Sequence, residues 1–508
     1  MSSFSLLDYL IFGSYLLASV LIGLRFVKGQ ESLSDYFLAG RNMNRFIVAM
    51  TILAALFSGI SYLAGPAEVY RSGFGFAWVL MSFFIATPFT ALYVLPHFYN
   101  SRYFTAYHFL QERFSLSARL LASGLFIFRV SLWLAAATYA PALALKEVTG
   151  LPLWFTILCT GLVTTIYTML GGMKAVIWTD VMQLVVLFGG QVVIMAVALS
   201  RIPGGLAGVF ETNLADHRFD LSFSFDPRER VTFWAAIIGG AFLSLVQMAT
   251  DQVSVQRYLT AGSLREAQRS LWIKLWMLVP VLVVFYGSGL VLYAFYKAHG
   301  DPLAGGQIAR ADQILPYFVI TQLPAGLPGL LIAAIFAASM STVSAGVNSL
   351  TSATLCDFFQ TLSHRSALSE RTLLSLARWF TLGYGVLVTA LAFAIAGMKA
   401  NLVESVNAII GLVGGPLLGL FLLGIFSRKT ETRGALIGCL SGFAVLLFFF
   451  FYEAPQPPSM KPAPLVSFLW LTMIGCVVTM LVGRGVSAFS SGSVAENRAV
   501  TPSRAPAE

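Results

Sequence analysis

The chain has 508 residues, of which 57% are hydrophobic and 11% are charged. Soluble proteins carry roughly 25% charged residues, so this composition excludes a soluble fold, a disordered chain and a nucleic-acid-binding protein. It predicts a polytopic membrane protein with no nucleic-acid partner. The net charge of +9 is then explained by Lys and Arg residues that flank membrane helices on the cytoplasmic side.

The predicted fold class is all-α, because apolar runs of roughly 18 or more residues divide the chain into about thirteen transmembrane helices. These runs lie near residues 6–27, 45–71, 74–96, 118–147, 152–172, 175–199, 232–258, 270–298, 314–360, 372–397, 400–427, 432–452 and 464–484. The run at 314–360 is too long for a single span, so we expect it to begin with a loop helix before Pro324 and Pro328.

Charge predicts the orientation of these helices. With the N-terminus outside, the inner loops carry roughly twice as many Lys and Arg residues as the outer loops, which is the bias of cytoplasmic loops. The sequence therefore predicts a multi-pass protein of the plasma (inner) membrane with its C-terminus in the cytoplasm. Residues 1–485 are expected to form one transmembrane domain, and the Ser-, Pro- and Ala-rich residues 486–508 a disordered cytoplasmic tail.

Two spans contain small and polar residues that weaken a helix. The second has Ser58, Ser61 and Gly65-Pro66, and the seventh has Gly239-Gly240 followed by polar positions. These polar positions are Ser244, Gln247, Thr250, Asp251 and Gln252. Interrupted segments at corresponding positions of two halves indicate a transporter site at the membrane midplane. The pattern predicts a five-plus-five inverted repeat, at about 45–200 and 232–427; the alternative is that the glycines only allow close helix packing.

The ninth span carries a polar stripe, whose spacings of three, four and seven place most members on one helix face. The stripe consists of Ala338, Ser341, Thr342, Ser344, Asn348 and Ser352. Hydroxyl and carbonyl oxygens suit a small desolvated cation such as Na⁺, so an ion site beside a broken helix is one interpretation. Serines that hydrogen-bond to their own helix are the other.

Arg129 and Asp180 are ionisable residues inside predicted spans, which makes each a candidate for a functional site. They are also candidates for pairing with each other. Asp180 lies only a few residues into its helix, so a helix-start or inner-gate role competes with ion binding.

Several segments of the chain resemble the sodium:solute symporter family, over residues from about 5 to 450. The segments are SDYFLAGR at 34–41, GPAEVYRSG at 65–73, YAPALAL at 139–145, GGMKAVIWTDVMQ at 171–183, TDQVSVQRYLTAGSLREAQRS at 250–270, AASMSTVSAGVNS at 337–349 and GGPLLGLFLLGIFSR at 414–428. GPAEVYRSG, YAPALAL and WTDVMQ are most similar to the branch that includes the iodide, monocarboxylate and multivitamin transporters. The resemblance implies a LeuT-type fold and inward co-transport driven by sodium.

The resemblance also implies the ligands of a main sodium site. They are carbonyl oxygens of Ala54, Phe57 and Ala338 and hydroxyls of Ser341 and Thr342. Some members add a second sodium, for which Asp180 and Ser344 are the candidates here, as second-ion ligands or as a gate. Ala345 stands where two-sodium members usually offer Ser or Thr, so we expect one sodium per cycle.

The solute site implied by the resemblance is small and mostly neutral. Its candidate residues are Leu56, Ser58, Ser61, Ser244, Gln247, Met248 and Asn407. Leu56 and Ser61 stand where sugar-transporting relatives carry amides, which disfavours a sugar. A basic residue at the position of Arg129 is common across the family, which favours a gating or structural role for it over direct contact with a carboxylate.

The sequence therefore predicts a symporter that uses Na⁺ as its coupling ion and imports a small organic anion, such as a monocarboxylate, a vitamin acid or a sialic acid. An amino acid or other neutral solute is the alternative. A membrane sensor of the same fold is the alternative from another class, and it would need a long cytoplasmic output region. No nucleophile–base constellation is evident, so no enzyme is predicted. The expected partners are Na⁺, the solute and the lipid bilayer, and a monomer is expected to suffice.

Overall fold

The computed structural model describes residues 5–100, 103–362, 368–397, 400–454 and 463–499, and for some stretches, such as 400–411 and 490–499, only the backbone. The elements up to residue 215 are α1 (Leu6–Arg25), α2 (Leu33–Leu38), η1 (Ala39–Arg41), α3 (Arg45–Leu56), α4 (Gly59–Ser72), η2 (Phe74–Ala77), α5 (Trp78–Met81), α6 (Phe83–Phe89), η3 (Thr90–Val94), α7 (Leu95–Asn100), α8 (His108–Arg113), α9 (Leu116–Thr149), α10 (Leu153–Ser200) and α11 (Gly205–Ala215).

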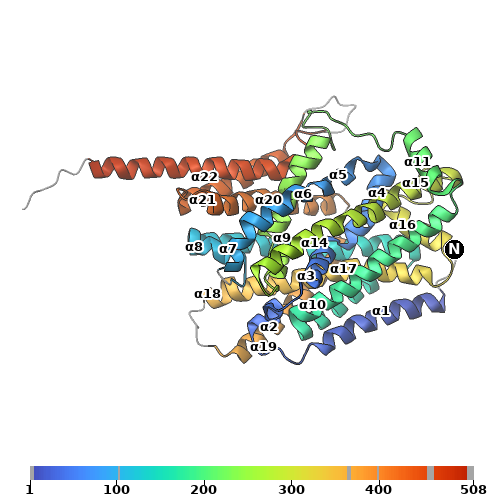
Figure 1. Ribbon diagram of the computed structural model, residues 1–508, viewed down its shortest axis with the longest axis horizontal. Coiled ribbons are helices and arrows are strands. Elements are labelled where there is room, and N and C mark those ends of the chain that lie inside the picture. Colours follow the sequence, from blue (N-terminus) through green and yellow to red (C-terminus); the bar gives the residue numbers. More distant parts are fainter. Residues whose placement is uncertain (1–4, 101–102, 363–367, 398–399, 455–462, 500–508) are drawn as a thin grey trace, which may run out of the picture.

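The elements after residue 215 are η4 (Ala235–Gly239), α12 (Gly240–Leu245), η5 (Val246–Thr250), α13 (Gln252–Tyr258), α14 (Leu264–Val281), η6 (Leu282–Tyr286), α15 (Gly287–His299), η7 (Ala311–Gln313), α16 (Ile314–Gln322), α17 (Leu327–Ala353), η8 (Thr354–Phe359), α18 (Gln360–Leu362), α19 (Glu370–Ala396), α20 (Ala400–Phe426), α21 (Thr432–Phe451), β1 (Glu453–Ala454), β2 (Ala463–Pro464) and α22 (Phe468–Ala499). Most of them run along one common direction (Figure 1).

The described residues contain nine helical stretches that are long and apolar enough to cross a membrane, and two bent helix pairs that qualify together. The 48-residue α10 is too long for one span, since a straight helix of that length would measure about 70 Å. It reverses at Gly172, whose backbone is not helical (φ 55°, ψ −152°). The described residues confirm the all-α fold, and counting α10 as two arms and α20 as a span brings the number of spans to the expected thirteen.

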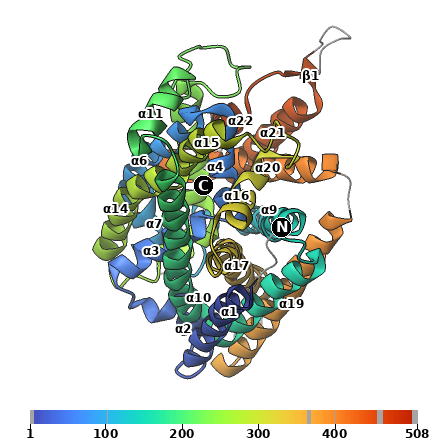
Figure 2. The ribbon, with the colours of Figure 1, turned by 90° about the vertical axis from the view of Figure 1, so that its right-hand side faces the viewer.

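Helix α17 lies inside the bundle, surrounded by α1, α9, α10 and α16 (Figure 2). Nearly all of its side chains are buried. Asp8 of α1 accepts hydrogen bonds from the backbone amides of Gly326 and Gly329, at 2.9 and 2.7 Å, where α17 begins. A carboxylate at this end of a helix is favourable, because the free amides and the helix dipole are both positive there. The first helix therefore supports the start of α17.

Both predicted helix interruptions are confirmed. α3 and α4 are bent by 68° at a short break, and the stretch from Ala235 to Thr250 is bent by 59° against α13. α16 and α17 are separate helices, as expected for the long run at 314–360.

Two features differ from the sequence expectations. A small antiparallel hairpin, β1 and β2, joins α21 to α22. α22 also continues to Ala499 and projects beyond the other helices (Figure 1), so the segment expected to be a disordered tail from 486 begins as helix. Extending an existing helix is far easier than starting one, which explains why Ser-rich sequence remains helical there.

Candidate functional site

The first helix break lies at Phe57 and Ser58. Phe57 has an extended backbone (φ −96°, ψ 91°), and the Ser58 hydroxyl starts α4 by accepting a hydrogen bond from the Ser61 amide at 3.2 Å. The Phe57 amide still donates to the carbonyl of Ala54 at 3.2 Å. The last carbonyl groups of a helix have no partner further along it, so the break exposes oxygen atoms in the middle of the bundle.

α17 presents hydroxyl groups to this break. Ser341 Oγ donates to the carbonyl of Ala54 at 2.9 Å, and Thr342 Oγ1 donates to the carbonyl of Ala338 at 3.1 Å. The structure thus brings the five residues of the expected main sodium site, including Phe57, into one buried region. Its carbonyl and hydroxyl oxygens are the ligands that hard cations prefer.

The second break lies between η5 and α13. Asp251 has an extended backbone (φ −86°, ψ 118°), and its carboxylate accepts a hydrogen bond from the Val253 amide at 2.9 Å. This cap places a carboxylate at the positive end of a half-helix, where negative charge is stabilised. The turn before it, η5, is a π-helical turn, and such wide turns often occur at functional sites.

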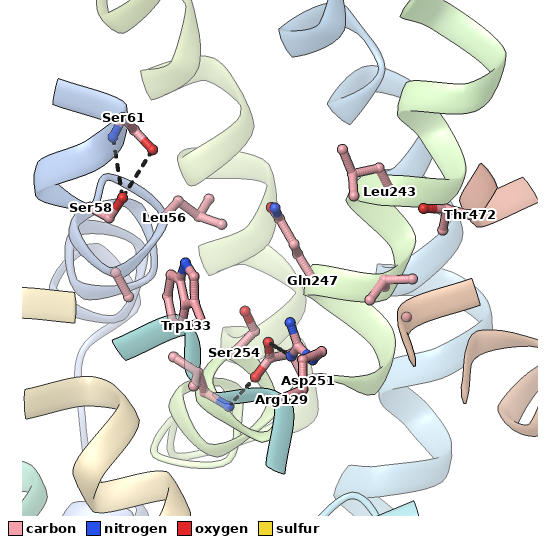
Figure 3. Close-up of a pocket in the computed structure, with 14 residues that line it drawn as sticks. Leu56, Ser58, Ser61, Arg129, Trp133, Leu243, Gln247, Asp251, Ser254 and Thr472 are labelled. Carbon is pink, nitrogen blue, oxygen red and sulfur yellow. Dashed lines mark hydrogen bonds and ion pairs between the residues drawn. The ribbon is translucent and has the colours of Figure 1, made fainter. Parts of the chain in front are cut away.

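A cavity of about 200 Å³ lies between the two breaks (Figure 3). Four of the seven predicted solute residues line it, namely Leu56, Ser58, Ser61 and Gln247. The other lining residues are Ala55, Arg129, Trp133, Leu243, Val246, Asp251, Val253, Ser254, Gly414 and Thr472. The cavity is therefore formed by both broken helices together with α9, α20 and α22.

Two predicted solute residues do not line this cavity. The Ser244 hydroxyl is hydrogen-bonded to the Ser82 hydroxyl at 2.8 Å, and the Met248 sulfur accepts a weak hydrogen bond from Thr87 Oγ1 at 3.6 Å. Both partners belong to the stretch that contains α6. Ser244 and Met248 therefore pack against that neighbouring helix.

The helix period explains this error. Leu243 and Gln247 are four residues apart and share the face that lines the cavity, whereas Ser244 and Met248 share the next face, about 100° further round. The positions implied by the family resemblance therefore include residues from both faces of this helix. The side chain of Asn407, the seventh candidate, lies outside the described residues.

Arg129 pairs with Asp251 and not with Asp180. The Arg129 Nη2 and Asp251 Oδ2 atoms are 2.5 Å apart, and the two side chains are 10% and 9% exposed. The suggested Arg129–Asp180 pair is wrong, because the second break brings a nearer carboxylate to Arg129. The Nε of Arg129 is buried and has no hydrogen-bond partner among the described residues. Arg129 also lines the cavity, so its Nε is an unused donor close to the space that a ligand would occupy.

Asp180 pairs instead with Arg257 of α13. Arg257 Nη2 and Asp180 Oδ2 are 2.8 Å apart, and neither side chain is exposed. The same carboxylate oxygen accepts a hydrogen bond from the Thr51 hydroxyl, whereas Oδ1 has no partner among the described residues. Ser344 donates to the carbonyl of Ser341 at 3.0 Å, within its own helix, which is the alternative considered for the polar stripe.

The sequence pointed only partly to the remaining cavity residues. Asp251 was among the polar residues of the seventh span, and a carboxylate at a helix interruption was the signal for its role. Trp133 lies one turn after Arg129 on α9, so their spacing could have placed both on one face. Thr472 gave no signal, because α22 lies outside the two predicted repeats.

Two broken helices, a cavity between them and buried ion pairs on one half-helix define a secondary transporter of the LeuT type. The sequence model of the sodium:solute symporter family matches residues 36–442, and the chain belongs to this family. It is therefore a multi-pass membrane protein that co-transports a solute, with Na⁺ as its coupling ion.

The relatives agree with this assignment. Sodium-coupled monocarboxylate transporter 1 of Xenopus laevis is 35% identical over 490 residues, which cover 94% of this chain and 77% of the relative. A sodium-dependent multivitamin transporter of Oryctolagus cuniculus is 34% identical and is covered to 78%, with 96% of this chain. The structure of a Na⁺-coupled sialic acid symporter in a substrate-bound, outward-open state superimposes with a TM-score of 0.86 at 27% identity, over 96% of this chain and 98% of that one.

Proposed function

We propose that this protein imports a small organic anion together with Na⁺. The observation that supports this most directly is Arg129, a buried cation in the wall of the cavity whose Nε has no partner among the described residues. Charge-assisted hydrogen bonds from a guanidinium group suit a carboxylate. The relatives named for monocarboxylates and for sialic acid transport carboxylic acids, which agrees with such a partner.

The volume of the cavity favours a small acid. About 200 Å³ lies below the 300–1,000 Å³ that is usual for drug-sized ligands. A monocarboxylate of a few carbon atoms therefore fits better than a vitamin acid or a sialic acid. Trp133, Leu56 and Leu243 offer apolar surface for its chain, and Ser58, Ser61 and Gln247 offer hydrogen bonds.

The proposed sodium ligands are the carbonyl oxygens of Ala54, Phe57 and Ala338 and the hydroxyls of Ser341 and Thr342. An ion held there joins α17 to the last turn of α3 and to Phe57, the residue before the Ser58 that starts α4. Sodium binding then fixes the serines that line the cavity. Because coupling is reciprocal, the solute strengthens Na⁺ binding by the same factor.

We propose a coupling ratio of one sodium per solute. The charge of Asp180 is already compensated by Arg257, and Ala345 supplies no hydroxyl beside Ser344. A second cation there would have to compete with a buried guanidinium group. Asp180 and Ser344 then serve the packing of α10 and α17 around the ion site.

The remaining features of the proposal concern placement and assembly. The protein lies in the plasma membrane with its N-terminus outside and its C-terminus in the cytoplasm, as the charge bias of the loops indicates. It acts as a monomer and performs no covalent chemistry on its solute. The single transporter domain comprises residues 1–485, with repeats at about 45–200 and 232–427.

A zwitterionic amino acid is the second candidate, and Asp251 favours it. This carboxylate lines the cavity beside Arg129, so the pair offers one charge of each sign. An amino acid would present its carboxylate to Arg129 and its ammonium group to Asp251. A simple anion would instead bind at the free guanidinium edge while the pair stays intact.

Three solutes of one size separate these candidates: propionate, propionamide and alanine. Purified protein in proteoliposomes should accumulate labelled propionate against its gradient under an inward Na⁺ gradient and not under an equal K⁺ gradient. Uptake of alanine without propionate would favour the second candidate. Uptake of propionamide at the same rate as propionate would contradict a role for negative charge.

A further inference from the structure

α22 contributes to the cavity although it lies beyond both predicted repeats and beyond the residues 36–442 that match the family. Its Thr472 is part of the cavity wall. Figure 3 shows Thr472 beside Leu243, apart from Arg129, Ser58 and Ser61. Thr472 and Arg129 therefore stand at different ends of the space that a solute would occupy.

Glycine residues allow α22 to come this close. A Cβ atom on Gly415 of α20 would lie only 2.5 Å from the carbonyl oxygen of Thr472. A Cβ on Gly239, in η4, would overlap the carbonyl oxygen of Leu469. α22 thus packs with its backbone against two helices of the core, and this packing carries the side chain of Thr472 to the cavity.

The hydroxyl of Thr472 is free to bind a ligand. Thr479, on the same helix, donates its hydroxyl proton to the carbonyl of Gly475 at 2.8 Å, which is the usual arrangement in membrane helices. Thr472 makes no such bond with any residue that the structure describes, although only 5% of it is exposed. Its cavity neighbours Leu243 and Val246 offer no side-chain partner. Because Thr472 lines the cavity, a polar group of the solute can form a hydrogen bond with its hydroxyl.

We propose that Thr472 hydrogen-bonds to a second polar group of the solute, at the opposite end from the carboxylate. This inference rests on the proposed transport of a small organic anion held at Arg129. The preferred class is then a short acid with a hydroxyl group at the far end of its chain, and Thr472 is a specificity-determining residue. Plain alkyl acids bind as well, but they leave the hydroxyl of Thr472 unpaired.

A matched series of acids tests the proposal. The thermal midpoint of purified protein in NaCl is followed against concentration of propionate, butyrate and valerate, and of 3-hydroxypropionate, 4-hydroxybutyrate and 5-hydroxyvalerate. One hydroxy acid should bind more tightly than the plain acid of equal length. Thr472→Val should lower the affinity for this hydroxy acid by about two- to tenfold, the effect of one neutral hydrogen bond. The affinity for the plain acid should change much less.

Two further variants serve as controls. Thr479→Val makes the same change two turns along α22, away from the cavity, and should preserve the preference. Thr472→Ser keeps the hydroxyl and should preserve it too, which remains informative if Thr472→Val fails to fold. A preference that survives in Thr472→Val, or no preference in the unmodified protein, would overturn the role of Thr472. If none of the acids binds, the proposed function itself is wrong.

Discussion

Two Arg–Asp pairs each use one residue at the half-helix α13: Asp251 at its start pairs with Arg129, and Arg257 near its end pairs with Asp180. The two pairs differ in their surroundings. Arg257 and Asp180 are fully buried, and the guanidinium group of Arg257 is committed: Nε donates to the Thr51 carbonyl at 3.2 Å and Nη1 to the Val253 carbonyl at 2.8 Å. Arg129 and Asp251 border the cavity, and the Nε of Arg129 has no partner in the described part of the chain.

The difference shows that an intramembrane charge does not by itself mark a ligand site. A guanidinium group whose donors are all used connects helices, here α13, α10 and α3. One with a free edge in a cavity can recognise an anion. The same residue types, placed at the two ends of one seven-residue helix, therefore support different roles.

The first prediction tests the buried Arg257–Asp180 pair and should give the largest effect. Arg257→Gln leaves Asp180 charged and buried without its partner, which costs about 3–5 kcal/mol of stability. We expect a lower free energy of unfolding, measured by titration with SDS in mixed micelles. Arg129→Gln should be less costly, because Asp251 borders a cavity that water can enter.

The double variant Asp180→Asn/Arg257→Gln is the control for this prediction. Removing both charges eliminates the uncompensated carboxylate, so much of the lost stability should return. The comparison between the two pairs would fail if Arg257→Gln were no more destabilising than Arg129→Gln.

The second prediction tests recognition at the cavity. Arg129→Gln removes a charged donor, worth about 1.5–3 kcal/mol, so the propionate concentration for half-maximal uptake should rise about tenfold to a hundredfold. The double variant Arg129→Gln/Asp251→Asn should regain the free energy of unfolding that Arg129→Gln loses, but not the affinity for propionate. Equal loss for propionate and the neutral propionamide would instead assign Arg129 the structural or gating role that the sequence favoured.

Much of the fold followed from the sequence, because the signals are local. Apolar runs gave the spans, and the small and polar residues near Phe57 and Asp251 gave the two breaks. The two arms of α10 followed from the separate apolar runs at 152–172 and 175–199. These features depend on residues close together in the chain, and membrane solvation makes their patterns strong.

The partners of the charged residues did not follow. Arg129 was placed with Asp180 because both lie inside spans, whereas the pairing depends on which helix faces which. Ser244 and Met248 do not line the cavity for a related reason, since the family resemblance does not fix how this helix is rotated about its axis. Thr472 could not be predicted, because its position depends on glycines in α20 and η4 that let α22 approach.

The third prediction separates the sodium site from both ion pairs. Ser341→Ala removes a hydroxyl that contacts the carbonyl of Ala54, and we expect the Na⁺ concentration for half-maximal uptake to rise about tenfold, or about 1.5 kcal/mol. Thr342→Ala should act in the same direction. If sodium dependence were unchanged in both variants while Asp180→Asn raised it, the ion would lie at the Asp180 pair and not at the break.

The last prediction concerns Gln247, a neutral residue that lines the same cavity as Arg129. Gln247→Ala should therefore raise the half-saturating propionate concentration by about two- to tenfold, the effect of one neutral hydrogen bond. Sodium binding without solute, measured by Na⁺-dependent thermal stabilisation, should stay nearly unchanged. Ser244→Ala is the matched control on the next helix face, where the hydroxyl contacts Ser82, and it should leave propionate affinity unaltered. Equal effects of the two substitutions would contradict the assignment of Gln247, and not Ser244, to the solute.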